Sequence, residues 1–528
     1  MSKHLQLSAA AAAVAAAFTA VPAHAAVTIA GTGASAIQNA LVAAVLTDYC
    51  AGSGTTNTIS VYDSVGTAPT TFPKGSTFTI SCPNPGTTGI SASPFVVSYD
   101  ATGGSWKAFT ATTPSLLAAA QADYTANGGQ NIPMEIDPAN QSSCTANGSL
   151  ALTLTNGVKL TVNSYYNCPL TPSTPTFGFT DVEPKLFTGT SVNQPFEWGT
   201  WNTGGVPLVT SFAPGAEPSG YPYQAFGVVF GVAASGALWA AMQNDQLTNG
   251  VLPTSICGTA FSAGASSNTL EVCTPIISRE MYASLIATTG GAALNDAQTL
   301  FITPPTASKA SNGIPALEVA RRDQGSGTQS GSNATFLGQG CDVAATETPD
   351  TPVTPDLSTT EDPSGGYINN SFTYNLSTGD VLNRLQGINP TADGFVNFSF
   401  PSNQYVIGAV SGEKYSASSI NGSGAFGTST APWGFLRLDG VLPTNQRVYQ
   451  GLYSYTTTEY FHCATGLSGD QLKLCTDLTT PTFADSLAKY AAGQSGGSVP
   501  TGIYPIQSVT TYGTYFTNGR TCAGARHH

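Results

Sequence analysis

The sequence predicts an α/β protein in which helices flank a sheet, and three observations favour this class. A short apolar run at 27–30 is followed by glycines and then by apolar residues at helical spacing. This succession of strand, turn and helix is typical of the opening of an α/β unit. A second succession of the same kind covers 316–337. Hydrophobic residues make up 41% of the 528 residues, which is enough for a core and excludes a disordered chain.

The first 25 residues have the composition of a secretory signal peptide. Lys3 supplies a positive charge, 5–20 is apolar, and the small residues Ala23 and Ala25 mark a cleavage site. The stretch 225–242 is long and apolar enough for a membrane span, but its glycines fit a buried strand that turns into a helix better. We therefore expect a soluble, exported protein, cleaved after Ala25.

Charge and cysteine content narrow the possible partners. Only 9% of residues are charged, the net charge is -13, and no basic patch stands out, so neither nucleic acid nor an anionic membrane is an expected partner. In an exported chain, ten cysteines without CxxC spacing indicate disulfides, and no metal or cofactor is expected. Sequence alone does not determine their connectivity. Closeness along the chain favours Cys50 with Cys82, Cys144 with Cys168, Cys257 with Cys273, and Cys463 with Cys475, which leaves Cys341 and Cys522.

Apolar spacing and turn residues predict the remaining elements. Residues 35–49 place apolar side chains on one helical face, with Ser35 as a natural N-cap. Residues 150–162 alternate around Asn156-Gly157, which is typical of a hairpin. Further strands are expected at 77–81, 95–99, 224–232, 316–320, 395–400, 405–410 and 448–455, and further helices at 278–287, 330–337 and 484–491.

The segment from Arg322 to Thr328 has the composition of an anion-binding loop. It lies between a predicted strand and a predicted helix, so free backbone N–H groups and the hydroxyls of Ser326 and Thr328 would surround an anion. Arg322 offers a forked, permanently charged donor that matches a tetrahedral oxyanion. Gly327 lets the backbone approach such a ligand closely.

Two other segments favour the same interpretation. Ser35 follows Gly31-Thr32-Gly33 and would add a hydroxyl at a second helix start. Asp181 lies between an apolar strand and a turn, where it would face the anion or, alternatively, cap a helix.

Together these segments resemble the phosphate-binding protein of bacterial phosphate ABC transporters, a type II periplasmic binding protein. The matching motifs are Gly31-Thr32-Gly33-Ala34-Ser35, Thr180-Asp181-Val182-Glu183-Pro184 and Arg322-Asp323-Gln324-Gly325-Ser326-Gly327-Thr328. A fourth contact of the family is a serine in a Gly-rich turn, for which Thr102 and Ser105 are both candidates. Ala36 stands where the family usually has an aromatic residue, and it would contribute its backbone N–H.

The resemblance implies two lobes that close at a hinge over phosphate or a related tetrahedral oxyanion. The first lobe would comprise 26–223 and 448–528, and the second would comprise 224–447. Arg322 would be the one cation of the site, and Asp181 would accept the proton that hydrogen phosphate carries and sulfate lacks. The chain is much longer than is usual for the family, which implies β-rich insertions. The resemblance also implies a monomeric periplasmic protein that is not an enzyme, with an ABC transporter permease as partner.

One insertion is expected to be an exposed loop. Residues 347–366 contain four prolines and five acids but no Lys or Arg, so they cannot bury much apolar surface.

Two other functional classes stay open. The richness in Gly, Thr, Ser and Asn is also typical of a secreted structural or adhesive protein, although the helix-bearing motifs argue against one. A divergent hydrolase on the same fold could use Asp181 and Glu183 as paired carboxylates. A His-based triad has little to draw on, and we expect His462 to be a surface residue.

Overall fold

The computed structural model describes residues 29–478 with interruptions, together with 503–504. The interruptions are 51–58, 84–88, 91–93, 103, 130, 155–158, 188–192, 196, 198–207, 210–222, 259–269, 288–299, 304–316, 340–369, 376, 389–404, 415–419, 421–423 and 425. Several predictions therefore lie outside the described residues: the signal peptide, the loop 347–366, the strand 395–400, the helix 484–491, and Cys341 with Cys522. No helix in the described part of the chain is long and apolar enough to cross a membrane.

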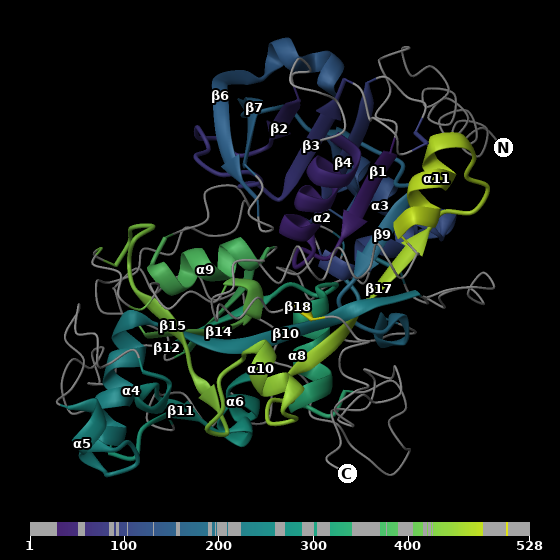
Figure 1. The fold of residues 1–528 in the computed structure, drawn as a ribbon. Coiled ribbons are helices and arrows are strands. Elements are labelled where there is room, and N and C mark those ends of the chain that lie inside the picture. Colours follow the sequence, from purple (N-terminus) through teal and green to yellow (C-terminus); the bar gives the residue numbers. More distant parts are fainter. Residues whose placement is uncertain are drawn as a thin grey trace.

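One large mixed sheet organises the described part of the chain (Figure 1). Its order is β13 (Asn370–Asn375), β12 (Leu317–Arg322), β14 (Tyr405–Ser411), β10 (Tyr223–Ser235), β17 (Thr456–Cys463), β9 (Phe177–Thr180), β1 (Ile29–Gly33), β4 (Phe95–Asp100), β3 (Thr77–Cys82), β2 (Ser60–Asp63), β7 (Lys159–Tyr166) and β6 (Thr145–Thr153). The strands β15 (Trp433–Phe435) and β18 (Ile503–Tyr504) also pair with β10. The expected α/β class is thus confirmed.

The strands β10 and β17 connect two groups of strands. The first half of β10 pairs antiparallel with β17, and its second half pairs antiparallel with β14 and β15. In Figure 1, β10 and β17 run across the middle, with β1 to β4 on one side and β12, β14 and β15 on the other. The division into lobes at 223 and 447 stays a prediction.

Helices flank this sheet. The α-helices are α2 (Gln38–Ala44), α3 (Pro114–Asn127), α4 (Gly236–Thr248), α5 (Thr254–Cys257), α6 (Arg279–Ile286), α8 (Gly327–Phe336), α9 (Thr378–Gln386), α10 (Asn445–Tyr449) and α11 (Gly469–Leu478). A π-helix, η1 (Val45–Cys50), extends α2, and the 3-10 helices are η2 (Gly104–Ala111), η3 (Pro138–Ser143), η4 (Pro184–Phe187), η7 (Glu271–Cys273) and η9 (Gly412–Lys414). Two short pairs complete the described elements: β5 (Met134–Glu135) with β8 (Thr171–Pro172), and β11 (Ile276–Ile277) with β16 (Arg437–Leu438).

The core forms where helices cover strands that are apolar on both faces. Every residue from Gly227 to Ser235 of β10 is buried, and both α4 and α9 pack on this strand. A strand covered on both faces needs a continuous apolar run, which explains why this stretch looks like a membrane span in sequence. The stretch instead forms β10 and the start of α4, as expected.

Most predicted elements are confirmed, but several have different limits or type. Gly31-Thr32-Gly33 ends the strand β1 instead of forming a turn after it, and α8 begins at Gly327 instead of at residue 330. The strands β6 and β7 pair antiparallel as the expected hairpin, and Ser278 caps α6 by accepting a hydrogen bond from Met281 N at 3.1 Å. Ser35 does not cap a helix, because α2 begins at Gln38. The strand expected at 448–455 is wrong: Thr444 accepts a hydrogen bond from Arg447 N at 3.2 Å and so starts the helix α10.

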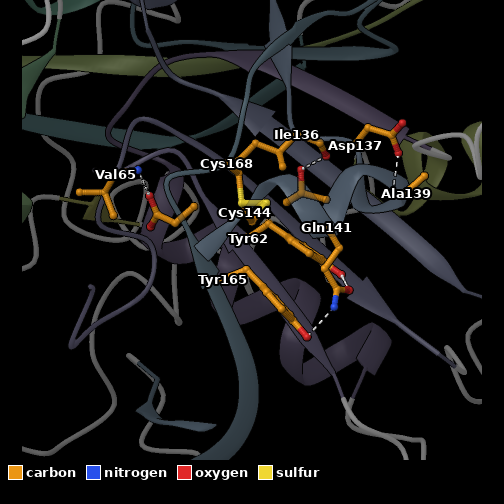
Figure 2. Close-up of a disulfide and its surroundings, with 11 residues drawn as sticks. Tyr62, Val65, Ile136, Asp137, Ala139, Gln141, Cys144, Tyr165 and Cys168 are labelled. Atoms are coloured by element: carbon orange, nitrogen blue, oxygen red, sulfur yellow. Dashed lines mark hydrogen bonds between the residues drawn. A yellow bond between two sulfur atoms is a disulfide. The ribbon is translucent and has the colours of Figure 1, made fainter. Parts of the chain in front are cut away.

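Disulfides tie neighbouring segments together. The four pairs expected from closeness are confirmed in the described residues: Cys50–Cys82, Cys144–Cys168, Cys257–Cys273 and Cys463–Cys475. Figure 2 shows that Cys144–Cys168 lies beside the stacked rings of Tyr62 and Tyr165, whose centroids are 5.0 Å apart. The Gln141 amide joins the two tyrosine hydroxyls by hydrogen bonds of 2.9 and 2.7 Å. These covalent links fit an exported protein.

Candidate anion-binding site

The candidate residues lie where strands of the sheet end. Ser35 follows β1, Ser105 follows β4, and Asp181 follows β9 directly. Because β4 and β9 both pair parallel with β1, their carboxyl ends meet at one edge of the sheet. Arg322 is the last residue of β12, in the other group of strands.

Asp181, Ser105 and Gly327 are in direct contact. The Asp181 backbone N–H donates to Ser105 Oγ at 2.9 Å, and both side chains are buried. A Cβ on Gly327 would collide with Ser105 Oγ and would lie 2.6 Å from Asp181 Cβ. Only glycine therefore allows the first turn of α8 to approach these two residues so closely.

A second contact joins the loop after β4 to the loop before α8. The Trp106 backbone N–H donates to Gly325 O at 2.8 Å. Gly104 has a φ of +70°, and a Cβ there would lie 2.8 Å from Ser326 Cα and 3.5 Å from Arg322 Nη2. These contacts bring Ser326 and Arg322 against the segment that carries Ser105.

Hydrogen bonds fix the Arg322 guanidinium. Its Nε donates to Asn375 O at 3.0 Å, and its Nη1 donates to Thr378 Oγ1 at 3.1 Å. Thr378 Oγ1 is in turn 3.2 Å from Ser35 Oγ. Ser35, which does not cap α2, is thus linked to Arg322 through a residue of α9.

Two helices begin at this point. Ser326 caps α8 through its hydroxyl, and the buried Gly327 and Thr328 form the first helical positions. Ser377 caps α9 in a capping box: its Oγ accepts from Asp380 N at 3.1 Å, and its own N–H donates to Asp380 Oδ2 at 2.8 Å. The partial positive charge at each helix start favours a nearby anion.

The structure separates the two residues that the sequence left as alternatives. Ser105 contacts Asp181, whereas Thr102 belongs to a buried ion pair. Lys107 Nζ lies 2.9 Å from Asp100 Oδ2 and donates to Thr102 Oγ1 at 2.6 Å, while the Thr102 hydroxyl donates to Asp100 Oδ1 at 2.6 Å. Burial lowers the pKa of Lys107, and Asp100 opposes that change. Ala36 is fully buried between Ser35 and α2.

Asp323 brings a second carboxyl beside Arg322. Its Oδ1 lies 3.8 Å from Arg322 Nη2, and its side chain is 13% exposed. Burial raises the pKa of Asp323 to about 7, although the charges of Arg322 and Lys107 lower it and Asp380 raises it further.

Sequence reasoning missed Thr378 and Lys107. The capping-box pattern Ser377-Thr378-Gly379-Asp380 could have indicated a third helix start, but nothing in the sequence places it beside Arg322. The surface position expected for His462 is wrong, because its side chain is buried and its ring packs edge-on against Phe109. Burial lowers the pKa of His462 to about 3, and its Nε2 lies 3.4 Å from Thr180 Oγ1.

The described donors suit a protonated, tetrahedral oxyanion. Hydroxyls, two helix starts and one guanidinium provide hydrogen-bond donors, while the Asp181 carboxylate provides an acceptor. No group of three or more His, Cys, Asp or Glu in the described residues could hold a metal ion.

No family model and no curated protein matches the chain. Among solved structures, the chain is similar to a phosphate ABC transporter substrate-binding protein with bound phosphate from Clostridium perfringens, with a TM-score of 0.24 and 10% identity over 51% of this chain and 65% of that one. The alignment thus spans less than two thirds of the Clostridium protein. An ABC-type phosphate transport receptor from Vibrio cholerae gives a TM-score of 0.27 and 8% identity over 60% of this chain and 79% of that one.

Proposed function

We propose that the protein is an exported solute-binding protein that captures phosphate or a related tetrahedral oxyanion for uptake by an ABC transporter. One observation carries this proposal: Asp181, Ser105, Gly327, Arg322 and Thr378 come from separate segments and meet at two helix starts. Such an arrangement concentrates donors around a small volume and includes one cation and one carboxylate. The proposed role is binding, with no chemical conversion of the ligand.

Asp181 is the proposed selector between oxyanions. An ionised carboxylate only accepts hydrogen bonds, so its partner must carry a proton. Hydrogen phosphate and hydrogen arsenate have one, whereas sulfate does not. Asp181 is buried, so its carboxylate would repel sulfate without a compensating hydrogen bond. Selectivity would therefore come from a lower affinity for sulfate and not from a higher affinity for phosphate.

The arrangement of strands supports a capture mechanism with two lobes. The contacting residues belong to both groups of strands that β10 and β17 connect. Ser35, Ser105 and Asp181 follow strands of one group. In the other group, Arg322 is the last residue of β12, and Gly327 and Thr378 follow β12 and β13. We propose that bending at β10 and β17 separates the two groups and admits the anion.

The test is a titration of the oxidised mature protein after removal of carried-over phosphate. Phosphate, arsenate and sulfate are compared at fixed ionic strength by calorimetry and thermal unfolding. Ligand at a hundredfold its Kd should stabilise the fold by about 2.7 kcal/mol. We expect stabilisation by phosphate and arsenate but not by sulfate, and no effect of any of the three would overturn the proposal.

Two variants then locate the site. Arg322→Ala should lower the affinity for every oxyanion by roughly tenfold or more, because it removes a charged donor. Asp181→Asn should mainly reduce the discrimination against sulfate. Arg447→Ala and Asp477→Asn, which break partly exposed ion pairs on α10 and α11, serve as matched controls. If the two site variants bind all three anions like the wild type, the proposed site is wrong.

A further inference from the structure

We infer that Thr378 is a positioning residue that links Arg322 to Ser35 in a relay of hydrogen-bond donors ending at the oxyanion. This inference rests on the proposed function and names a residue that the sequence motifs do not include. The relay consists of Arg322 Nη1, Thr378 Oγ1 and Ser35 Oγ, with successive distances of 3.1 and 3.2 Å. All three side chains are buried.

The chemistry of the three groups sets the direction of the relay. A guanidinium has donors only, so Arg322 donates and Thr378 Oγ1 accepts. The Thr378 hydroxyl then keeps its own proton for a second hydrogen bond. A hydroxyl that accepts from a cation is polarised, which makes it a better donor to the next oxygen. We therefore assign the Thr378 hydroxyl as the donor and Ser35 Oγ as the acceptor.

The last proton of the relay belongs to Ser35. Within the described residues, the Ser35 hydroxyl forms a hydrogen bond with Thr378 and with no other side chain. Once it accepts from Thr378, its own proton is available to a further acceptor. Ser35 lies between β1 and α2, at the sheet edge where Ser105 and Asp181 also lie. An oxyanion at this edge would take that proton, and Arg322 would act on it through Thr378.

The relay also has a structural consequence. Ser35 and Thr378 are 343 residues apart in the chain, and they follow strands of the two different groups. The terminal donor is therefore strongest when both groups of strands are in contact. Through Thr378, the affinity of the Ser35 segment for the anion depends on contact with the other group of strands.

The experiment is a double-mutant cycle with phosphate as the probe. Thr378→Val keeps the side-chain shape without the hydroxyl, and Thr378→Ser keeps the hydroxyl. We expect Thr378→Val and Ser35→Ala each to lower the affinity for phosphate by about tenfold. Thr378→Ser should bind phosphate with an affinity within about threefold of the wild-type value. Because both single variants break one relay, the double variant should bind about as weakly as Ser35→Ala alone. Calorimetry gives the four affinities.

The control is Thr176→Val, which also removes a buried threonine hydroxyl. Thr176 directly precedes β9, and its hydroxyl donates to Ala30 O at 3.1 Å. It should leave phosphate binding unchanged. If Thr378→Val does not fold, Thr378→Ala takes its place in the cycle. Full additivity, or wild-type affinity without the Thr378 hydroxyl, would overturn the relay while phosphate binding by the wild type stands. Absence of phosphate binding by the wild type would overturn both the relay and the proposed function.

Discussion

Asp323 and His462 show how burial acts on single titratable residues beside the site. The pKa of Asp323 is raised to about 7, so the carboxyl is half protonated near neutral pH despite the nearby Arg322. The pKa of His462 is lowered to about 3, so its ring is neutral. Both changes have the same cause, which is that burial disfavours the charged form. The two residues therefore respond to pH in opposite directions.

Asp323→Asn should change how stability depends on pH. The folded chain keeps the Asp323 proton up to about pH 7, whereas the unfolded chain releases it near 3.8. The folded state therefore binds more protons in this window, and stability falls as the pH rises through it. Asn has no proton to lose, so we expect the variant to gain roughly 2–4 kcal/mol relative to the wild type between pH 4 and pH 8.

Urea unfolding of both proteins across this range measures the difference. His462 contributes to both profiles equally, with stability lost as the pH falls from 6.5 towards 3, so it cancels in the comparison. Parallel profiles would contradict the role assigned to Asp323.

At the scale of elements, the close approach of α8 depends on one glycine. Gly327→Ala would place a Cβ 2.6 Å from Asp181 Cβ, so α8 must move away from β9 and η2. We expect a loss of about 1–3 kcal/mol in the free energy of unfolding, together with weaker phosphate binding. Denaturant unfolding and calorimetry measure the two effects. The matched control is Gly66→Ala, because no atom lies within 4 Å of the added Cβ there, and a loss of equal size in both variants would show that close approach is not the cause.

The sequence predicts elements best where a local pattern decides them. The hairpin β6–β7 and the Ser278 cap of α6 follow from side chains within a few residues of each other. The prediction that Ser35 caps a helix is wrong, because the sequence cannot distinguish a hydroxyl that caps the next helix from one that bonds to a distant residue. Only the fold shows that Ser35 contacts Thr378. The segment 448–455 is rich in Val, Leu and Tyr, which favours a strand, but the Thr444 cap begins a helix that includes its first two residues.

At the scale of the whole molecule, the candidate site was predicted in part. Motifs predict the segments around Ser35, Ser105, Asp181 and Arg322, and the structure brings these segments together. Thr378 could not be found, because its place depends on β13 pairing parallel with β12, which sets α9 beside Arg322. The order of strands is a property of long-range pairing and leaves little trace in a local sequence window.

Whole-molecule stability and ligand binding should separate at the Cys463–Cys475 disulfide. Cys463 is opposite Phe177, the first residue of β9, whereas Asp181 follows the last residue of that strand. The double substitution Cys463→Ser and Cys475→Ser opens a link over a separation of 12 residues. We expect about 2–3 kcal/mol less stability, with phosphate affinity unchanged. Thermal unfolding and calorimetry on the oxidised proteins test this, and a tenfold loss of affinity would show that the disulfide end of β17 is coupled to the site.

The burial of the site has a consequence for how fast an anion can be exchanged. Asp181 and Arg322 are each 2% exposed. The hydrogen bond from Trp106 to Gly325 joins η2, which carries Ser105, to the loop that follows Arg322. A dissolved anion cannot collide with these groups until the segments part. Under the proposed function, the rate of capture at high anion concentration would therefore be set by how often the protein opens, and a captured anion would leave only at the next opening. The residence time of the bound anion would then be set by the opening rate of the protein.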